Sequence, residues 1–297
     1  MIIDSKGLIQ DGIYAIGAAE LPGYLITGQH PILFDAGMTF MGPLYLADLK
    51  TYLGDVNRLR FHFLTHSHFD HAGASPFLKR HIPDMQIGAG PAAAETFRKP
   101  NAIELIRNLS RSLEEKYGDL IGKEDVTFQG LEIDLVLDEG MEIDLGAGRT
   151  CKVMTTPGHT RDSLSFYIPA LKAVVTGEAV GVFDKNFTIH PEFTSSYKDY
   201  MNSLNKLAAL DIEILMMSHF FTLTGEDARG YINKSIEKTY IFKERIEQYL
   251  ADSHGDRKSV VQKIFKEDFE DTGAILQDVR PYLINLEAKV RVIAEGR

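Results

Sequence analysis

Three histidines and one aspartate within six positions are the residues best suited to do chemistry here: His66-Ser67-His68-Phe69-Asp70-His71. They follow residues 59–65, an apolar and aromatic run that predicts a short strand entering the core. His66 and His68 are two positions apart, so both can project from extended chain toward one point. Asp70 and His71 fall where a helix would begin, and they can face a second point nearby. Because burying four ionisable groups is costly unless something neutralises them, this spacing predicts two metal ions side by side.

The His-x-His-x-Asp-His run of residues 66–71 resembles the signature of the metallo-β-lactamase superfamily. Two later segments are similar to the same family. Thr156-Pro157-Gly158-His159-Thr160 resembles its second metal motif, and Val174–Glu178 resembles the segment that usually ends in Gly-Asp. The resemblance spans roughly residues 10–225 and implies an α/β fold, the αββα sandwich of that superfamily.

The resemblance also implies a ligand set. One metal would be held by His66, His68 and His159, and the other by Asp70, His71 and His219, with Glu178 at or near the bridge. The superfamily usually has aspartate where this chain has Glu178. The extra methylene leaves open whether that carboxylate bridges both metals or binds one. We expect two divalent ions, zinc first, with iron or manganese as the alternatives that more oxygen ligands would favour.

Several neighbouring residues are expected to support or cover this site. By the same resemblance, Asp35 in Asp35-Ala36-Gly37 orients the metal loop without binding metal; a simple turn is the alternative. Ser163 is expected to hydrogen-bond the metal loop. Phe220 stands where the family commonly has a glycine after His219, and Phe220 and Phe221 would narrow or cover the pocket. His190 either contacts substrate or lies in a surface loop.

The rest of the chain alternates between strand and helix patterns. Helical spacing predicts helices over residues 42–53, 74–81 and 92–117, the last broken at Pro100. Alternation predicts strands over 131–135, 141–145 and 151–155. Further helices are predicted over 197–208 and 226–252, near 260–265, and after Pro281.

These elements suggest two regions. Residues 1–225 would form the catalytic domain, with a helical insertion at about 92–118, and residues 226–297 a helical appendage covering the active site. A helical appendage after the last ligand resembles glyoxalase II-type thioesterases. Together with the insertion, the layout resembles the PqsE-type quinolone-signal response proteins.

Composition narrows the function classes. The 297 residues carry a net charge of −10, which argues against a large nucleic-acid surface. No apolar run approaches a membrane span, and the N-terminus lacks the pattern of a signal peptide. The single cysteine, Cys151, allows no intramolecular disulfide and is interpreted as a buried apolar residue. We expect a cytoplasmic enzyme with a small-molecule substrate. The sequence leaves open whether the chain forms a homodimer.

The ligand set points to hydrolysis. A water between two divalent ions is acidified enough to attack an electrophilic carbonyl, and Asp70 can orient it. The leading hypothesis is hydrolysis of an acyl thioester or ester. The alternatives are a phosphodiesterase, an iron-dependent persulfide-type dioxygenase, and a regulatory protein whose metals are structural.

Overall fold

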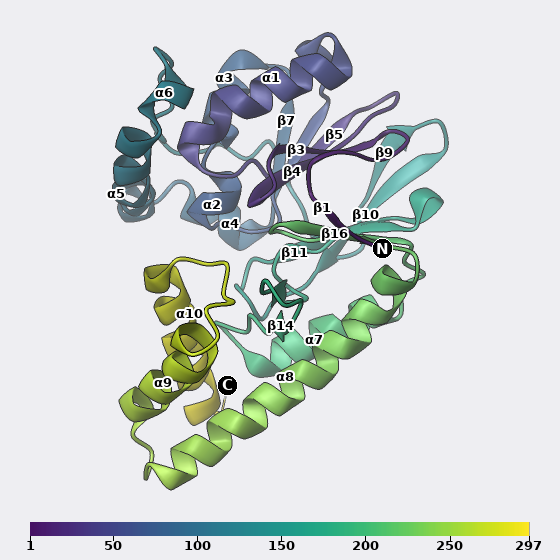
Figure 1. The fold of residues 1–297 in the computed structure, drawn as a ribbon. Coiled ribbons are helices and arrows are strands. Elements are labelled where there is room, and N and C mark those ends of the chain that lie inside the picture. Colours follow the sequence, from purple (N-terminus) through teal and green to yellow (C-terminus); the bar gives the residue numbers. More distant parts are fainter. Residues whose placement is uncertain (297) are drawn as a thin grey trace.

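Two seven-stranded sheets form the centre of the computed structural model, which describes residues 1–296 (Figure 1). The first sheet is built from apolar, mostly alternating segments of the N-terminal half, and its last four strands run parallel. In sheet order its strands are β2 (Gly7–Gln10), β3 (Ile13–Ala18), β4 (Leu21–Ile26), β5 (Ile32–Phe34), β6 (Phe61–Phe63), β7 (Gln86–Ala89) and β8 (Leu135–Val136).

The second sheet takes one strand from the N-terminus and the rest from the second half of the chain. In sheet order its strands are β1 (Ile2–Asp4), β16 (Phe221–Thr224), β15 (Ile214–Met216), β12 (Ala173–Val175), β11 (Leu164–Ile168), β10 (Arg149–Thr155) and β9 (Glu142–Gly146). Only β12 and β15 pair in parallel within it. A separate two-stranded ladder joins β13 (Val182–Phe183) to β14 (Ile189–His190).

Three apolar layers hold the sheets and helices together. Side chains such as Phe34, Phe63 and Phe166 fill the space between the sheets. Helices α1 (Gly42–Leu53) and α3 (Ser75–His81) pack on the first sheet, and α7 (Tyr197–Ala208) and α8 (Glu226–Asp252) on the second (Figure 1). The predicted αββα sandwich is therefore confirmed. Short 3-10 turns occur at Thr39–Met41, Val56–Arg58 and Pro169–Leu171.

The helical insertion forms where the sequence predicts it. Its pieces are α4 (Pro91–Thr96), α5 (Pro100–Lys116) and α6 (Gly118–Ile121). Pro100 begins α5 because proline lacks the N–H that the first turn of a helix leaves unpaired, so the predicted break there is confirmed. Helices α5 and α6 lie out at the side of the sandwich beside α1, whereas α4 lies closer to its centre (Figure 1).

The C-terminal helices share a core with the second sheet. After α8 come α9 (Arg257–Phe265), a π-helical turn (Lys266–Glu270) and α10 (Val279–Ala294). Ile232, Val260 and Leu286 belong to the same apolar cluster as Leu215 and Leu223 of the sheet. The domain division at residue 225 stays a prediction. Within residues 1–296, no helix has the length and apolar character needed to cross a membrane.

The strand predicted over residues 131–135 is wrong for most of its length. Only Leu135–Val136 pairs with β7, although Leu131 and Ile133 are buried as the alternation requires. The Asp134 carboxylate accepts the N–H of Ile87 at 2.8 Å. A side chain thereby takes the place of a backbone partner, and the ladder stops there.

His62, in the middle of β6, makes the stability of the fold sensitive to acid. It is fully buried, and its Nε2 lies 2.8 Å from the Ser75 hydroxyl. Burial lowers the pKa of His62 to about 4. The unfolded chain takes up this proton near pH 6.5, so stability present above that pH is lost as the pH falls toward 4.

From this difference we expect the His62 contribution to fall by about 2 kcal/mol between pH 7.5 and pH 5. Denaturant unfolding at both pH values should show a smaller loss for His62→Gln, which keeps a hydrogen-bonding group but does not titrate. Equal losses in the two proteins would contradict this assignment.

Candidate metal centre

The His-x-His-x-Asp-His run lies directly after β6, where apolar strand residues give way to polar loop. His66 and His68 project from the loop, and Asp70 and His71 from the short helix α2 (Phe69–Ala72). The His66 and His68 rings lie 4.6 Å apart and the His66 and His71 rings 4.3 Å apart. The structure thus brings the four residues together, as their spacing predicts.

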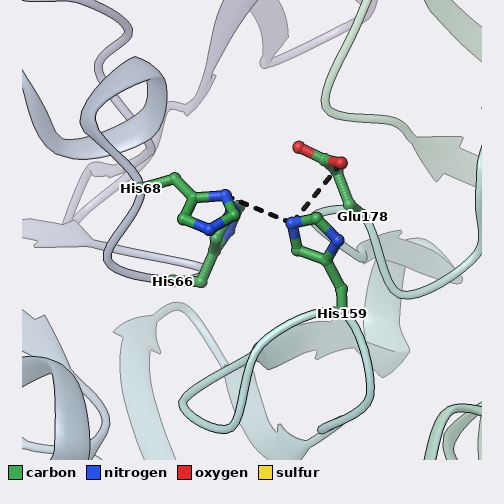
Figure 2. A group of neighbouring side chains, drawn as sticks. All are labelled: His66, His68, His159 and Glu178. Atoms are coloured by element: carbon green, nitrogen blue, oxygen red, sulfur yellow. Dashed lines mark hydrogen bonds and ion pairs between the residues drawn. The ribbon is translucent and has the colours of Figure 1, made fainter. Parts of the chain in front are cut away.

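Three other loops complete the cluster. His159 follows β10, Glu178 follows β12 and His219 follows β15, so each lies just beyond the end of a strand in the second sheet. His159 and Glu178 are buried together with His66 and His71. Figure 2 shows His66, His68, His159 and Glu178 converging from their separate loops. All seven residues predicted as ligands therefore lie at one place.

Their ligand atoms form two groups that share Glu178. One group is His66, His68, His159 and Glu178; the other is Asp70, His71, Glu178 and His219. Within each group, all the atoms lie within 4.8 Å of one another. The Oε2 atom of Glu178 is 3.5 Å from His159 Nε2, whereas its Oε1 is 3.3 Å from His71 Nε2 and 3.2 Å from His219 Nε2.

Glu178 therefore points one carboxylate oxygen at each group, which is the arrangement a bridging ligand needs. Burial raises the pKa of this carboxyl, but the adjacent His159, His219 and His71 outweigh burial and hold the pKa well below its usual range. Glu178 is thus an anion between histidines. Its role as a metal ligand, like that of the six other residues, stays a prediction.

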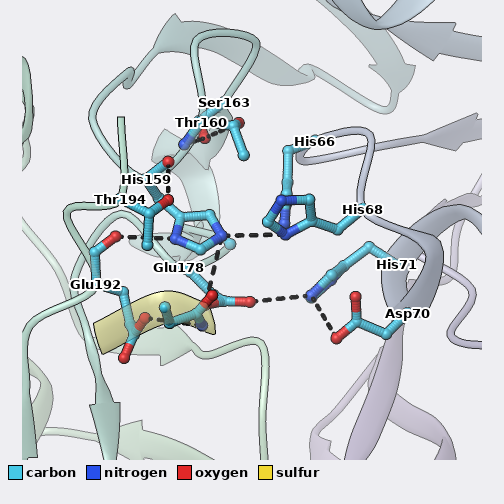
Figure 3. Close-up of polar contacts among 12 residues, drawn as sticks. His66, His68, Asp70, His71, His159, Thr160, Ser163, Glu178, Glu192 and Thr194 are labelled. Carbon is cyan, nitrogen blue, oxygen red and sulfur yellow. Dashed lines mark hydrogen bonds and ion pairs between the residues drawn. The ribbon is translucent and has the colours of Figure 1, made fainter. Parts of the chain in front are cut away.

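Hydrogen bonds to backbone carbonyls hold two of the histidine rings from behind, as Figure 3 shows for His159. His159 Nδ1 donates to the Glu192 carbonyl at 2.8 Å, and His219 Nδ1 to the Glu20 carbonyl at 2.9 Å. These bonds turn each Nε2 toward the cluster, where the Nε2 atoms of His159 and His219 lie 3.5 and 3.2 Å from the Glu178 carboxylate.

The histidine cluster fits metal ions. The Nε2 atoms of His66 and His71 are buried and lack a hydrogen-bond partner among the described residues. Burial, followed by the neighbouring histidines, lowers the pKa of His66 well below its ordinary value, and burial beside His159 lowers the pKa of His68 to about 4. Burial also opposes protonation of His71 and His219, but Asp70, Asp35 and Glu178 raise the pKa of His71 well above its ordinary value, and Glu178 raises the pKa of His219. His66 and His68 are therefore in the neutral form that binds a divalent cation, whereas a cation would displace a proton from His71 and His219.

Asp35 holds two of these histidines in place. Its carboxylate accepts from Thr65 N and Thr65 Oγ1, both at 2.8 Å, and from His71 Nδ1 at 3.1 Å. The Thr65 oxygen in turn accepts from His66 Nδ1 at 3.0 Å. Asp35 therefore orients the metal loop from behind, as predicted from the family resemblance.

We expect Asp35→Asn to weaken metal binding by about 10- to 100-fold. Asparagine would retain the left-handed backbone conformation of this position (φ 54°), but its amide would present N–H groups to donors. Titration with a competing chelator measures the change in affinity. An unchanged affinity would mean that Asp35 only shapes the turn.

The loop bearing His159 is fixed by side chains on both sides. Ser163 Oγ lies 2.7 Å from Thr160 Oγ1 and accepts from Thr160 N, which is the loop-bracing role expected for it. Thr194 Oγ1 donates to the His159 carbonyl at 2.5 Å. Gly158 has a φ of 134°, and a Cβ there would lie 2.3 Å from the Tyr200 backbone, so only glycine fits.

A cavity of about 530 Å³ opens over the cluster and reaches Asp70, Glu178 and His219. Phe220 lines it, as predicted, whereas Phe221 is not part of its wall and packs against Phe183. His190 also lines the cavity, and its Nε2 is 3.2 Å from Asp184 Oδ2. The surface-loop alternative for His190 is therefore wrong, although substrate contact stays a prediction.

Other supporting residues escaped sequence reasoning. The Asp162 carboxylate accepts from Ser67 N at 2.8 Å and so ties the two metal loops together. The Glu192 carbonyl orients His159, and the Glu192 side chain is paired with Lys289 of α10. Asp162, Glu192 and Lys289 lie outside the motifs described above. Asp162 contacts a residue 95 positions away, and Lys289 contacts one 97 positions away. The contact between Glu192 and His159 uses a backbone carbonyl, which any residue type could supply.

Comparisons with known proteins agree with this geometry. The model of the metallo-beta-lactamase superfamily matches residues 23–219. The metallo-beta-lactamase fold-containing protein ST1585 of Sulfurisphaera tokodaii is 27% identical over 246 residues, 77% of this chain and 86% of that protein. Its solved structure, 20% identical in the structural comparison, covers 96% of this chain and 98% of its own, with a TM-score of 0.59.

Two further matches bear on fold and activity. The Thermus thermophilus metallo-beta-lactamase family protein TTHA1429 has a TM-score of 0.63 at 21% identity, over 97% of this chain and 95% of that chain. A hydroxyacylglutathione hydrolase of Gloeothece citriformis is 29% identical over 164 residues, 54% of this chain and 50% of that enzyme. With the family match spanning the metal motifs, this chain belongs to the metallo-β-lactamase superfamily.

Proposed function

We propose that the protein is a metal-dependent hydrolase that cleaves acyl thioesters or related esters. The observation that carries the proposal is the pair of ligand groups joined by Glu178 beneath the cavity. The sequence match to a hydroxyacylglutathione hydrolase, an enzyme named for a thioester substrate, supports the same reaction class.

His66, His68 and His159 would hold one ion, and Asp70, His71 and His219 the other, with Glu178 shared. Two divalent ions there would supply a hydroxide near neutral pH and stabilise negative charge on the substrate oxygen. Zinc suits the histidine-rich set; iron or manganese would suit its carboxylates.

The chain itself would position and protect the reaction. Asp70 lines the cavity and is less buried than Glu178, with 20% of its side chain exposed against 7%. It is therefore the carboxylate placed to orient the attacking water or hydroxide by accepting a hydrogen bond from it. Asp35, Glu192 and Glu20 would keep the histidine rings from turning.

The acidic cavity wall weighs against a phosphodiesterase. Glu20 and Asp278 lie in the wall beside the metal-site carboxylates, with Lys116 as the cation among the described lining residues. Like charges repel a phosphodiester outside the metal site itself. A persulfide-type dioxygenase would differ from the proposal by requiring bound iron and taking up oxygen. A regulatory protein would differ by keeping its function without catalysis.

Release of free thiol from a varied panel of acyl thioesters tests the proposal. The assay suits this protein because its one cysteine, Cys151, is fully buried and burial raises the pKa of its thiol. We expect turnover by metal-loaded protein, its loss in His66→Ala, and weaker turnover of bis-p-nitrophenyl phosphate. Absence of thioester cleavage across the panel would contradict the proposal.

A further inference from the structure

The cavity over the metal centre is walled largely by segments outside the two sheets. The loop after β5, the helical insertion, the turn before α10 and α10 itself each contribute apolar side chains, among them Met38, Phe40, Leu113, Tyr117, Leu276 and Tyr282. Asp70, Glu178 and His219 lie in the same wall, so one continuous space joins the ligand groups to this apolar surface.

Part of the apolar surface is held in place by its own packing. Phe40 and Tyr117 stack with ring centroids 4.5 Å apart and planes 15° apart, which ties the loop after β5 to the insertion. Phe40 and Tyr282 are each more than nine-tenths buried. A preformed apolar cavity of about 530 Å³ is of the size and character that encloses a small organic group.

The cavity offers little to a negatively charged ligand. Lys116 is the cation among its described lining residues, and its ammonium lies 5.0 Å from the Tyr117 ring centroid on an exposed helix end. The Glu192 carboxylate is already neutralised by Lys289 at 2.9 Å, and Glu20 and Asp278 add negative charge. The two carboxylates of a glutathione moiety would therefore find Lys116 as the one lysine or arginine among these described lining residues.

We infer that the acyl group recognised by this protein is apolar and uncharged, such as a medium-length alkyl or an aryl chain. The inference rests on the proposed thioester hydrolysis and names its substrate class. It separates this chain from hydroxyacylglutathione hydrolases, because it assigns selectivity to acyl packing against Leu113, Tyr117 and Leu276.

Thioesters that share one small uncharged leaving group, N-acetylcysteamine, isolate the acyl contribution. Each methylene moved from water into an apolar wall should raise kcat/KM about three- to fourfold between butanoyl and octanoyl. Succinyl and lactoyl thioesters should be poorer substrates than butanoyl. A flat series, or faster cleavage of S-lactoylglutathione, would overturn the inference.

Leu276→Asp places a carboxylate in the apolar wall without touching the ligand groups. Val279→Asp is the matched control, because Val279 is 46% exposed three positions later and does not line the cavity. We expect Leu276→Asp to lower octanoyl kcat/KM about tenfold relative to butanoyl, and Val279→Asp to leave that ratio unchanged. Equal ratios in both variants would contradict the role of Leu276.

Calorimetric titration with 1-octanol and 1-butanol tests the cavity without any reaction. Tighter binding of 1-octanol to the metal-loaded protein, lost in Leu276→Asp and kept in Val279→Asp, supports the apolar site. If 1-octanol binds this way but no thioester is cleaved, the proposed function fails and the apolar ligand class stands. If thioesters are cleaved but neither alcohol preference nor chain-length dependence appears, the inference alone fails.

Discussion

Glu178→Gln should lower the bound metal from two equivalents to one or fewer and reduce thioester kcat/KM by more than about a hundredfold. Loss of a residue that only hydrogen-bonds a metal ligand lowers metal affinity or activity by about 10- to 100-fold. Glu178 should matter more, because its oxygens reach both ligand groups, 3.5 Å from His159 and 3.3 Å from His71. Glutamine keeps the shape of the side chain but removes the negative charge that offsets two cations.

Elemental analysis and steady-state kinetics on the same preparation measure both effects. Glu142→Gln is the matched control, since that carboxylate lies on the surface and pairs with Lys152. The control should bind two equivalents and keep full activity. Two equivalents and unchanged activity in Glu178→Gln would show that the shared carboxylate is dispensable.

Lys289→Met should lower the free energy of unfolding by about 3–5 kcal/mol, because it leaves the buried Glu192 carboxylate without its cation. Lys289 Nζ lies 2.9 Å from Glu192 Oε1 and donates to the Pro191 carbonyl at 3.0 Å. Both side chains of the pair are almost fully buried. Asn285 adds a bond to the other Glu192 oxygen at 3.2 Å, so two residues of α10 hold this carboxylate.

Denaturant unfolding checks the effect, with Lys152→Met as the control. The Lys152–Glu142 pair is about half exposed, so its loss should cost no more than about 1 kcal/mol. The double variant Lys289→Met/Glu192→Met should recover most of the loss, since apolar replacement of a whole buried pair is often neutral. Equal costs for the two single lysine variants would contradict a buried-pair role.

The same contact connects the C-terminal helices to the metal centre. The Glu192 carbonyl accepts from His159 Nδ1 at 2.8 Å, and α10, the yellow ribbon in Figure 3, holds the Glu192 side chain. Lys289→Met should therefore also weaken metal binding by those molecules that remain folded. Chelator competition below the unfolding transition separates this effect from lost stability.

The clustering of the seven proposed ligand residues could be predicted from sequence because each follows a strand in a short, recognisable motif. His66 to His71 come from one run, and His159 and His219 each follow a strand whose apolar pattern is plain. The helices at 42–53 and 226–252 likewise have the predicted bounds, since their apolar spacing is regular. In these cases the local pattern and the fold agree.

Other features depend on contacts between distant residues and could not be predicted locally. Lys289 and Glu192 are separated by 97 positions, and neither lies in a motif. Residues 131–135 alternate like a strand. However, the Asp134 carboxylate accepts the backbone N–H of Ile87, which a neighbouring strand would otherwise bond, and the strand pairing ends there. The reach of Glu178 to both groups depends on where β12 ends relative to α2, which sequence spacing does not define.

Metal content of protein purified without added metal, measured beside Glu178→Asp, tests most directly whether Glu178 spans both ligand groups. We predict two equivalents in the natural chain and no gain in the shortened variant, because the glutamate oxygens already face both groups. One equivalent in the natural chain, rising to two in Glu178→Asp, would contradict the shared-carboxylate site and the hydrolytic mechanism built on it.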